Sequence, residues 1–260
     1  MRVPQEFLDL AHELADAAGC VLMRYWRTGV EAEIKPDDSP VSRADRESEA
    51  LIRERIEARC PGHGILGEEY GMARGDAEWL WVVDPLDGTK SFLKGKPTFG
   101  ILIGLVHEGR HVAGVMDFPA VGDRWAGADG HGTRLNGETV RTRPCPTLAD
   151  AVTASVGPDA ACEDDIPLYA ALRRAVRWQM FGLEAMAYGL IASGRIDLAV
   201  DGNLDRHDIA AFEPVVRNAG GVLSGPAGEP VTPDYRGRVV AAGDPALLRA
   251  ALAAMRGAGA

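Results

Sequence analysis

The sequence predicts an α/β protein whose α+β N-terminal half is followed by an α/β C-terminal half. Two stretches with apolar residues at helical spacing, 4–28 and 42–60, precede several short apolar runs separated by turn residues. In the second half, strand-like and helix-like stretches alternate, a pattern that favours stacked layers of helices and sheet. A Pro-rich stretch around 143–150 is the expected boundary, which predicts halves over residues 1–146 and 147–260.

The first half is expected to begin with two helices. The first, over 4–28, ends at Gly29, because glycine readily adopts the conformation that terminates a helix. The second begins at Ser42, whose hydroxyl caps it together with Asp45 in a capping-box-like arrangement, and it ends near Cys60. A mostly antiparallel sheet is expected to follow.

Short apolar runs between turns predict the strands. In the first half the expected strands cover residues 31–35, 65–67, 79–83, 99–106 and 112–118, the last two forming a β-hairpin, and a polar loop covers 36–40. In the second half the expected strands cover 151–156, 196–200, 222–224 and 239–241. The expected helices of that half cover 165–177, 183–193, 209–218 and the stretch from 245, before a frayed tail at 257–260.

The composition excludes several classes of protein. With 46% hydrophobic and 25% charged residues among 260, the chain can bury a large core and is neither disordered nor fibrous. Its 38 acidic and 28 basic side chains give a formal charge of -10, which disfavours nucleic acid or an anionic membrane as the main partner. A small molecule is the expected partner, and divalent cations would let so acidic a protein bind a phosphate.

A cytoplasmic location is also predicted. Acidic residues interrupt the first apolar stretch, so no signal peptide is expected, and no apolar stretch is long enough to span a bilayer. The cysteines have neither a Cys-x-x-Cys pair nor a metal-ligand spacing and are expected to be reduced thiols: Cys20, Cys60, Cys145 and Cys162.

The stretch 79–92, WLWVVDPLDGTKSF, is where chemistry is expected. A buried strand over 79–83 ends in a turn that contains Asp84, Asp87, Gly88 and Thr89. Two carboxylates three positions apart on a tight turn can converge on hard cations, which prefer oxygen ligands. The short helix expected after them would direct its N-terminal amides at a phosphate.

Two other interpretations of this stretch are possible. Turn chemistry alone selects Asp, Pro and Gly, so the stretch could be a surface turn. Haloacid-dehalogenase-like phosphatases carry Asp-x-Asp-Gly-Thr after an apolar strand. The spacing here is Asp-x-x-Asp-Gly-Thr, which argues against an aspartyl-phosphate nucleophile.

Further acidic residues lie at the ends of expected elements. Asp45, Glu68 and Asp208 could join Asp84 and Asp87 in one crevice, because strand ends and helix starts gather in α/β folds. Each also has an ordinary structural explanation. Asp45 could cap a helix, Glu68 could be an exposed loop carboxylate, and Asp208 could be a simple N-cap.

Three motifs in this order resemble those of the inositol monophosphatase superfamily. They are Gly67-Glu68-Glu69, the stretch from Asp84 to Thr89, and the stretch from Asp205 to Ala211, with support from residues 194–197 and 218–221. The resemblance spans most of the chain. It implies a layered α-β-α-β-α sandwich, a homodimer, and Mg²⁺-dependent hydrolysis of phosphate monoesters, which lithium inhibits in many members.

The resemblance also implies roles for individual residues. Two or three Mg²⁺ ions would be held by Glu68, Asp84, Asp87, Asp208 and the backbone carbonyl of Leu86, with Asp84 bridging two ions. Because the metal ions would activate the attacking water, Glu68 is also expected to be a catalytic residue.

Other positions are implied to handle water and phosphate. Asp45 and Thr89 would orient the attacking water and help to deprotonate it. The amides of Gly88 and Thr89 would bind the phosphate oxygens. Lys90 could add a positive charge or lie in solvent.

The residues after Asp87 bear on the substrate. Asp87-Gly88-Thr89-Lys90-Ser91-Phe92 looks like the histidinol-phosphate phosphatase branch. Inositol phosphatases typically have Asp-Gly-Thr-Thr-Asn-Phe, and the branch acting on 3′-phosphoadenosine compounds more often has Thr-Lys-Glu-Phe.

Histidinol carries an ammonium and an imidazole, so its pocket should offer further carboxylates. The resemblance implies that Asp201 contacts the substrate, and Glu184 is a second candidate. Glu184 could instead be a glutamate on a helix surface. His207 stands where the superfamily commonly has an aromatic residue, and its role is open.

The expected function is hydrolysis of L-histidinol phosphate to L-histidinol and phosphate, in histidine biosynthesis. A metal-activated water attacks directly and no phosphoenzyme forms. Inositol-1-monophosphatase is the runner-up, followed by a phosphatase of 3′-phosphoadenosine 5′-phosphate or of a sugar phosphate. The alternative from a different class is a catalytically silent metal- or phosphate-binding protein.

Overall fold

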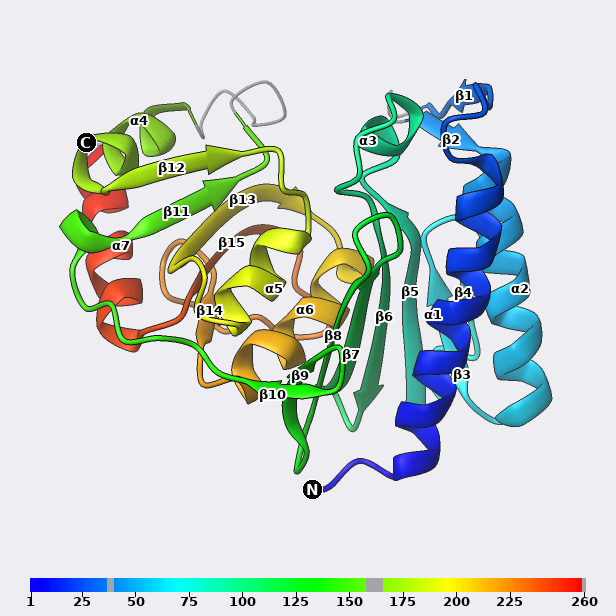
Figure 1. Ribbon diagram of the computed structural model, residues 1–260. Coiled ribbons are helices and arrows are strands. Elements are labelled where there is room, and N and C mark those ends of the chain that lie inside the picture. Colours follow the sequence, from blue (N-terminus) through cyan, green and yellow to red (C-terminus); the bar gives the residue numbers. More distant parts are fainter. Residues whose placement is uncertain (37–39, 158–165, 259–260) are drawn as a thin grey trace.

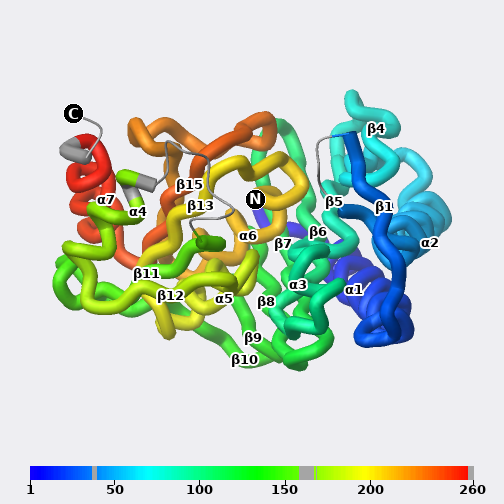
Figure 2. Tube along the Cα trace, turned by 90° about the horizontal axis from the view of Figure 1, so that it is seen from above, coloured from blue at the N-terminus to red at the C-terminus, as the bar shows by residue number. Residues whose placement is uncertain are grey.

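The computed structural model describes residues 1–36, 40–157 and 166–258 and contains five layers in the order α-β-α-β-α (Figure 1). The helices of these residues are α1 (Gln5–Tyr25), α2 (Arg43–Arg59), α3 (Thr89–Leu93), α4 (Ile166–Ala175), α5 (Met186–Ala192), α6 (Arg206–Asn218) and α7 (Pro245–Ala258), with a 3-10 turn at Leu148–Asp150. Seen from above, α5 and α6 lie between the two sheets (Figure 2). The predicted layered sandwich is confirmed.

The first sheet has eight strands and is mostly antiparallel, as predicted. In spatial order they are β10 (Glu138–Val140), β9 (Gly132–Leu135), β8 (Asp123–Ala128), β7 (Arg110–Phe118), β6 (Gly100–His107), β5 (Trp79–Asp87), β3 (Gly64–Gly67) and β4 (Gly71–Ala73). Only β3 and β5 pair in parallel among these described strands. The expected hairpin is therefore β6 and β7.

The second sheet has five strands. In spatial order they are β12 (Trp178–Phe181), β11 (Val152–Ser155), β13 (Leu198–Leu204), β15 (Gly237–Ala242) and β14 (Val222–Ser224). Strand β11 pairs in parallel with β12 and β13, whereas β15 is antiparallel to its neighbours. A separate two-stranded ribbon joins β1 (Ala32–Ile34) to β2 (Pro40–Ser42).

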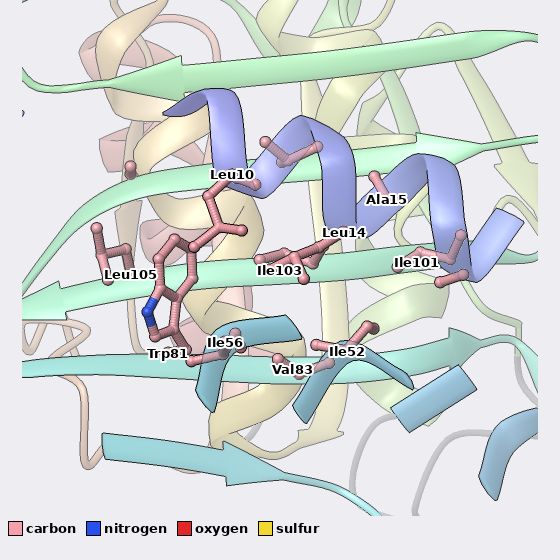
Figure 3. Close-up of a cluster of buried hydrophobic side chains, with 14 of the residues drawn as sticks. Leu10, Leu14, Ala15, Ile52, Ile56, Trp81, Val83, Ile101, Ile103 and Leu105 are labelled. Carbon is pink, nitrogen blue, oxygen red and sulfur yellow. The ribbon is translucent and has the colours of Figure 1, made fainter. Parts of the chain in front are cut away.

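The outer helices pack on the first sheet through a continuous apolar core. Leu14 of α1 and Ile52 of α2 meet Val83 of β5 and Ile103 of β6 there, all of them fully buried or nearly so (Figure 3). Such burial is the main source of stability for amphipathic helices. The predicted start of α2 is confirmed, because Ser42 is its N-cap and forms a capping box with Asp45.

Helix α6 belongs to the second half of the chain but packs directly on the first sheet. Gly104, Gly114 and Gly127 lie opposite one another on β6, β7 and β8. A Cβ at any of them would overlap atoms of α6, including the carbonyl oxygen of Ala211 at Gly114. We call these three residues the glycine seat, because they let the backbone of α6 approach the sheet closely.

Several predicted boundaries were wrong. Strand β5 continues through Asp87 instead of ending at Val83, because its pairing with β6 resumes after a register shift between Asp84 and Asp87. Strand β13 covers Leu198–Leu204 rather than 196–200, and α5 begins at Met186 rather than 183. Strands β2, β4 and β12 were not predicted, and Pro40 of the expected polar loop belongs to β2. Short strands were expected after 118 without bounds, and they are β8, β9 and β10.

Some predictions fall outside the described residues. These are Cys162, positions 37–39 of the polar loop, the first position of the helix expected from 165, and the end of the tail at 259–260. The other cysteines, Cys20, Cys60 and Cys145, are free thiols. Within the described part of the chain, no helix has the length and apolar character needed to cross a membrane.

Candidate active site

Two carboxylates stand at the end of β5, where the register shift turns the strand. Asp84 is 3% exposed, and its Oδ1 accepts a hydrogen bond of 2.9 Å from the amide of Leu86. Asp87 Oδ2 accepts one of 3.0 Å from the amide of Ala185, just before α5. Both carboxylates therefore lie at the carboxyl end of β5, next to helix α5 of the second half.

Glu68 lies at the same end of the sheet, because it directly follows β3, which runs parallel to β5. Its amide donates to the carbonyl of Val83 over 3.2 Å. The turn that carries it is held by Glu49 of α2, which is fully buried and accepts from the amides of Glu69 (2.7 Å) and Tyr70 (3.2 Å). This role of Glu49 was not predicted. A glutamate on the apolar face of a helix could have indicated a buried carboxylate with a structural partner.

Asp208 comes from the first turn of α6. The helix begins at Arg206, three residues before the predicted start, and its N-cap is Asp205. Asp208 Oδ2 accepts a hydrogen bond of 2.6 Å from the amide of Asp205, completing a capping box. The simple N-cap interpretation of Asp208 was therefore wrong, and Oδ1 takes no part in the capping box.

These acids converge on two adjacent positions that share Asp84. One oxygen each from Asp84, Asp87 and Asp208 lie within 4.8 Å of one another. So do one oxygen each from Glu68 and Asp84 and one ring nitrogen of His207. Both groups have the composition of a divalent-cation site, the first with oxygen alone and the second with oxygen and nitrogen.

The electrostatics of the cluster favour a bound cation. Burial and the neighbouring carboxylates raise the pKa of Asp84 and Asp87 well above the usual range, and burial raises the pKa of Asp208. Lys35 Nζ contacts Glu68 Oε1 at 2.9 Å and Glu69 Oε1 at 2.6 Å, an ion pair that was not predicted. One lysine cannot balance this many carboxylates, so the donor set fits divalent cations.

Asp45 and Thr89 are in contact beside the cluster. Thr89 Oγ1 lies 3.1 Å from Asp45 Oδ1 and 3.2 Å from the carbonyl oxygen of Leu86. Asp45 Oδ2 meanwhile accepts from the amide (2.8 Å) and hydroxyl (2.6 Å) of Ser42. Asp45 thus caps α2 with one oxygen and meets Thr89 with the other, and burial raises the pKa of Asp45.

Glu184 lies against the turn at Gly88. Gly88 has φ of +76° as the N-cap of α3, and a Cβ there would lie 3.0 Å from Glu184 Cγ, so a glycine is required. Glu184 Oε1 accepts from Ser91 Oγ (2.6 Å) and Lys96 Nζ (3.2 Å). The helix-surface interpretation of Glu184 was wrong, because the residue has φ of +50° and precedes α5.

Asp201 is more enclosed. It is 2% exposed in β13, and its two oxygens accept from the amide of Val156 (2.8 Å) and the hydroxyl of Tyr188 (3.0 Å). Burial raises the pKa of Asp201 to about 6. Its predicted contact with substrate stays a prediction.

Known proteins resemble the chain over most of its length. The bifunctional phosphatase IMPL2, chloroplastic, of Arabidopsis thaliana is 39% identical over 220 residues, which cover 84% of this chain and 64% of that protein. A histidinol-phosphatase of Chlorobaculum parvum is 35% identical over 242 residues, covering 89% and 86%. A solved inositol monophosphatase from Zymomonas mobilis has a TM-score of 0.89 and 37% identity, covering 97% of this chain and 98% of that one.

These similarities define the class of the protein as a phosphoric monoester hydrolase. The profile of the inositol monophosphatase family matches residues 3–259. The chain belongs to the inositol monophosphatase family, and the resemblance inferred from its motifs is confirmed.

Proposed function

We propose that this phosphatase is Mg²⁺-dependent and that its substrate is L-histidinol phosphate. The observation that carries the choice of substrate is the position of Glu184. Its Cγ lies against Gly88 of the expected phosphate-binding turn, and its carboxylate accepts hydrogen bonds from Ser91 and Lys96 next to that turn. Histidinol is a cationic alcohol, whereas inositol is a neutral polyol. Lys96 contacts only Oε1 of this carboxylate, so the proposal assigns the cationic group of histidinol to the other oxygen, Oε2, through charge complementarity.

The metal ligands in this proposal are Glu68, Asp84, Asp87, Asp208 and the carbonyl of Leu86. Cations bound by these groups would activate a water and stabilise the charge on the leaving oxygen. The amides of Gly88 and Thr89 would bind the phosphate oxygens.

The proposed path of the proton runs through two side chains. The hydroxyl of Thr89 donates to Asp45, so its own oxygen is free to accept a hydrogen bond from a water. When that water attacks phosphorus, its proton moves through Thr89 to Asp45. The bond to the histidinol oxygen breaks, and the alkoxide that leaves takes up a proton from a solvent water. The raised pKa of Asp45 suits a carboxylate that must hold a proton briefly.

A panel of phosphate esters at fixed Mg²⁺ tests this proposal: histidinol phosphate, inositol 1-phosphate, fructose 1,6-bisphosphate and 3′-phosphoadenosine 5′-phosphate. We expect the highest kcat/KM with histidinol phosphate. Glu184→Gln should lower kcat/KM for histidinol phosphate by on the order of 10-fold, as expected for loss of one charged contact, and leave inositol 1-phosphate almost unaffected.

Glu54→Gln, at an exposed position of α2, is the matched control and should change neither value. Equal losses with both substrates in Glu184→Gln would show that Glu184 only supports the turn. Inositol 1-phosphate remains the second candidate substrate because of the 37% identity to the Zymomonas mobilis enzyme. Phosphate release from none of the esters would favour a silent binding protein.

A homodimer and a cytoplasmic location complete the proposal. Apolar side chains at the edge of the second sheet support the dimer, because β12 exposes Trp178 (64%), Met180 (42%) and Phe181 (45%). Sedimentation velocity of the full chain should give twice the monomer mass, and a monomer at micromolar concentration would contradict the dimer.

A further inference from the structure

His207 lies next to the cation site, and its ring has no hydrogen bond to another residue of the described part of the chain. It is the second residue of α6, between Arg206 and Asp208, and its side chain is 20% exposed. Its Nε2 lies 3.9 Å from Asp208 Oδ1 and its Nδ1 lies 4.0 Å from Asp205 Oδ1. Both separations are longer than a hydrogen bond, so these contacts do not occupy the ring nitrogens.

The imidazole ring of His207 lies close to two of the acidic residues. One ring nitrogen lies within 4.8 Å of an oxygen of Glu68 and an oxygen of Asp84, while the other position sharing Asp84 is lined by oxygen alone. An imidazole nitrogen suits Fe²⁺, Ni²⁺ and Zn²⁺, whereas Mg²⁺ prefers carboxylates, carbonyls and water. Mn²⁺ also prefers oxygen ligands but accepts a nitrogen more readily than Mg²⁺ does, so it can report on such a ligand. The two positions therefore differ in the chemistry of their donors.

We infer that His207 supplies a nitrogen ligand to the cation held by Glu68 and Asp84, so that this position prefers a first-row transition cation to Mg²⁺. The neighbouring position, with Asp84, Asp87 and Asp208, keeps the preference for Mg²⁺. The inference rests on the proposed metal dependence and specifies which ion each position takes.

Asp205 strengthens the assignment. With Nε2 on the side of Asp208, Nδ1 faces the carboxylate of Asp205, which also accepts from the amide of Arg206 at 2.6 Å. A carboxylate that accepts a hydrogen bond from the second ring nitrogen orients a ligating imidazole and increases its basicity, and a small turn of the His207 ring would shorten the 4.0 Å separation to such a bond. Asp205, the N-cap of α6, would then serve as a positioning residue for His207 in the cation-bound protein.

The direct test is pulsed EPR of Mn²⁺ bound to the full-length protein. We expect a ¹⁴N coupling from His207 in the wild type, which changes to a ¹⁵N pattern when histidine is ¹⁵N-labelled. The coupling should vanish in His207→Phe and in His207→Trp, two variants that keep an aromatic ring. It should persist in His12→Phe, the matched control on α1, whose side chain faces a different part of the surface.

Calorimetric titration gives an independent readout. His207→Phe should weaken Mn²⁺ binding by on the order of 10- to 100-fold, the range typical for disturbed metal sites, with a much smaller effect on Mg²⁺. The preference for Mn²⁺ over Mg²⁺ should therefore fall by at least about 10-fold.

The outcomes separate this inference from the proposed function. Mn²⁺ binding without nitrogen coupling in the wild type would overturn the role of His207 and leave the metal-dependent phosphatase intact. Coupling that persists in both His207 variants would overturn it equally. If neither Mn²⁺ nor Mg²⁺ bound at all, the metal dependence would fail and the inference with it.

Discussion

Three buried aspartates of this protein differ in the charge that surrounds them. Asp197 is 1% exposed, and Arg143 donates to both of its oxygens at 2.7 Å. Among the described residues, Asp201 has the neutral donors Val156 and Tyr188. Asp84 has a backbone donor, Leu86, and three acidic neighbours, Glu68, Asp87 and Asp208. Burial alone therefore does not mark a functional site. A functional carboxylate is distinguished by being buried without a positively charged side chain beside it.

The pKa values follow this order. Burial would raise the pKa of Asp197, but hydrogen bonds from Arg143 and Val152 outweigh it and lower the value. Burial raises the pKa of Asp201 to about 6, where neutral donors offset it only in part. At Asp84 burial and like charges act together. A bound cation would supply Asp84 with the compensating positive charge that Arg143 supplies to Asp197.

The largest expected effect comes from Asp84→Asn. Turnover should fall by several orders of magnitude, because both candidate cation positions lose a shared ligand. The metal-free protein should keep or gain stability, since one of the mutually repelling buried charges is removed. Phosphate release and thermal unfolding with and without Mg²⁺ measure the two effects, and near-wild-type turnover would remove the metal assignment.

A smaller effect is expected from pH at Asp201. A carboxylate whose pKa is raised on folding destabilises the protein when it ionises, so stability should fall as the pH rises from 3.8 to about 6 and stay level above. The shift corresponds to at most about 3 kcal/mol. Urea unfolding of the metal-free protein between pH 4 and 7 measures it. Asp201→Asn should flatten this part of the curve, and an unchanged slope in the variant would contradict the assignment.

The smallest effect is expected from Asp197→Asn. Loss of charged hydrogen bonds should cost about 2 kcal/mol of stability, reduced by the partial exposure of Arg143. Because the pKa of Asp197 is lowered, its contribution is present at neutral pH and disappears as the pH falls through the folded value. Urea unfolding at pH 7 measures the loss, while kcat should be unchanged. A large loss of kcat in folded protein would break the distinction between Asp197 and Asp84.

Local sequence signals predicted much of the fold correctly. The capping box at Ser42 and the hairpin of β6 and β7 follow from spacing and turn chemistry, and both were confirmed. The early start of α6 was a missed local signal, since Asp205 and Asp208 form a capping box. Another error arose where tertiary pairing decides the structure, because the continuation of β5 through Asp87 depends on β6.

The site was predictable only in part for the same reason. The motifs named Glu68, Asp84, Asp87 and Asp208, but their convergence depends on the parallel pair β3 and β5 and on α6, which spacing does not encode. The contacts of Lys35 with Glu68 and of Glu184 with Ser91 join residues far apart in the chain, so no local pattern revealed them.

The glycine seat under α6 has a mechanical consequence. At these three positions no side chain separates the sheet from the helix, so backbone atoms limit how closely α6 approaches the sheet. The reach of Asp208 toward Asp84 is thereby fixed from beneath by Gly104, Gly114 and Gly127. A side chain at any of the three positions would overlap α6, so the helix would have to move away from the sheet and carry Asp208 away from Asp84.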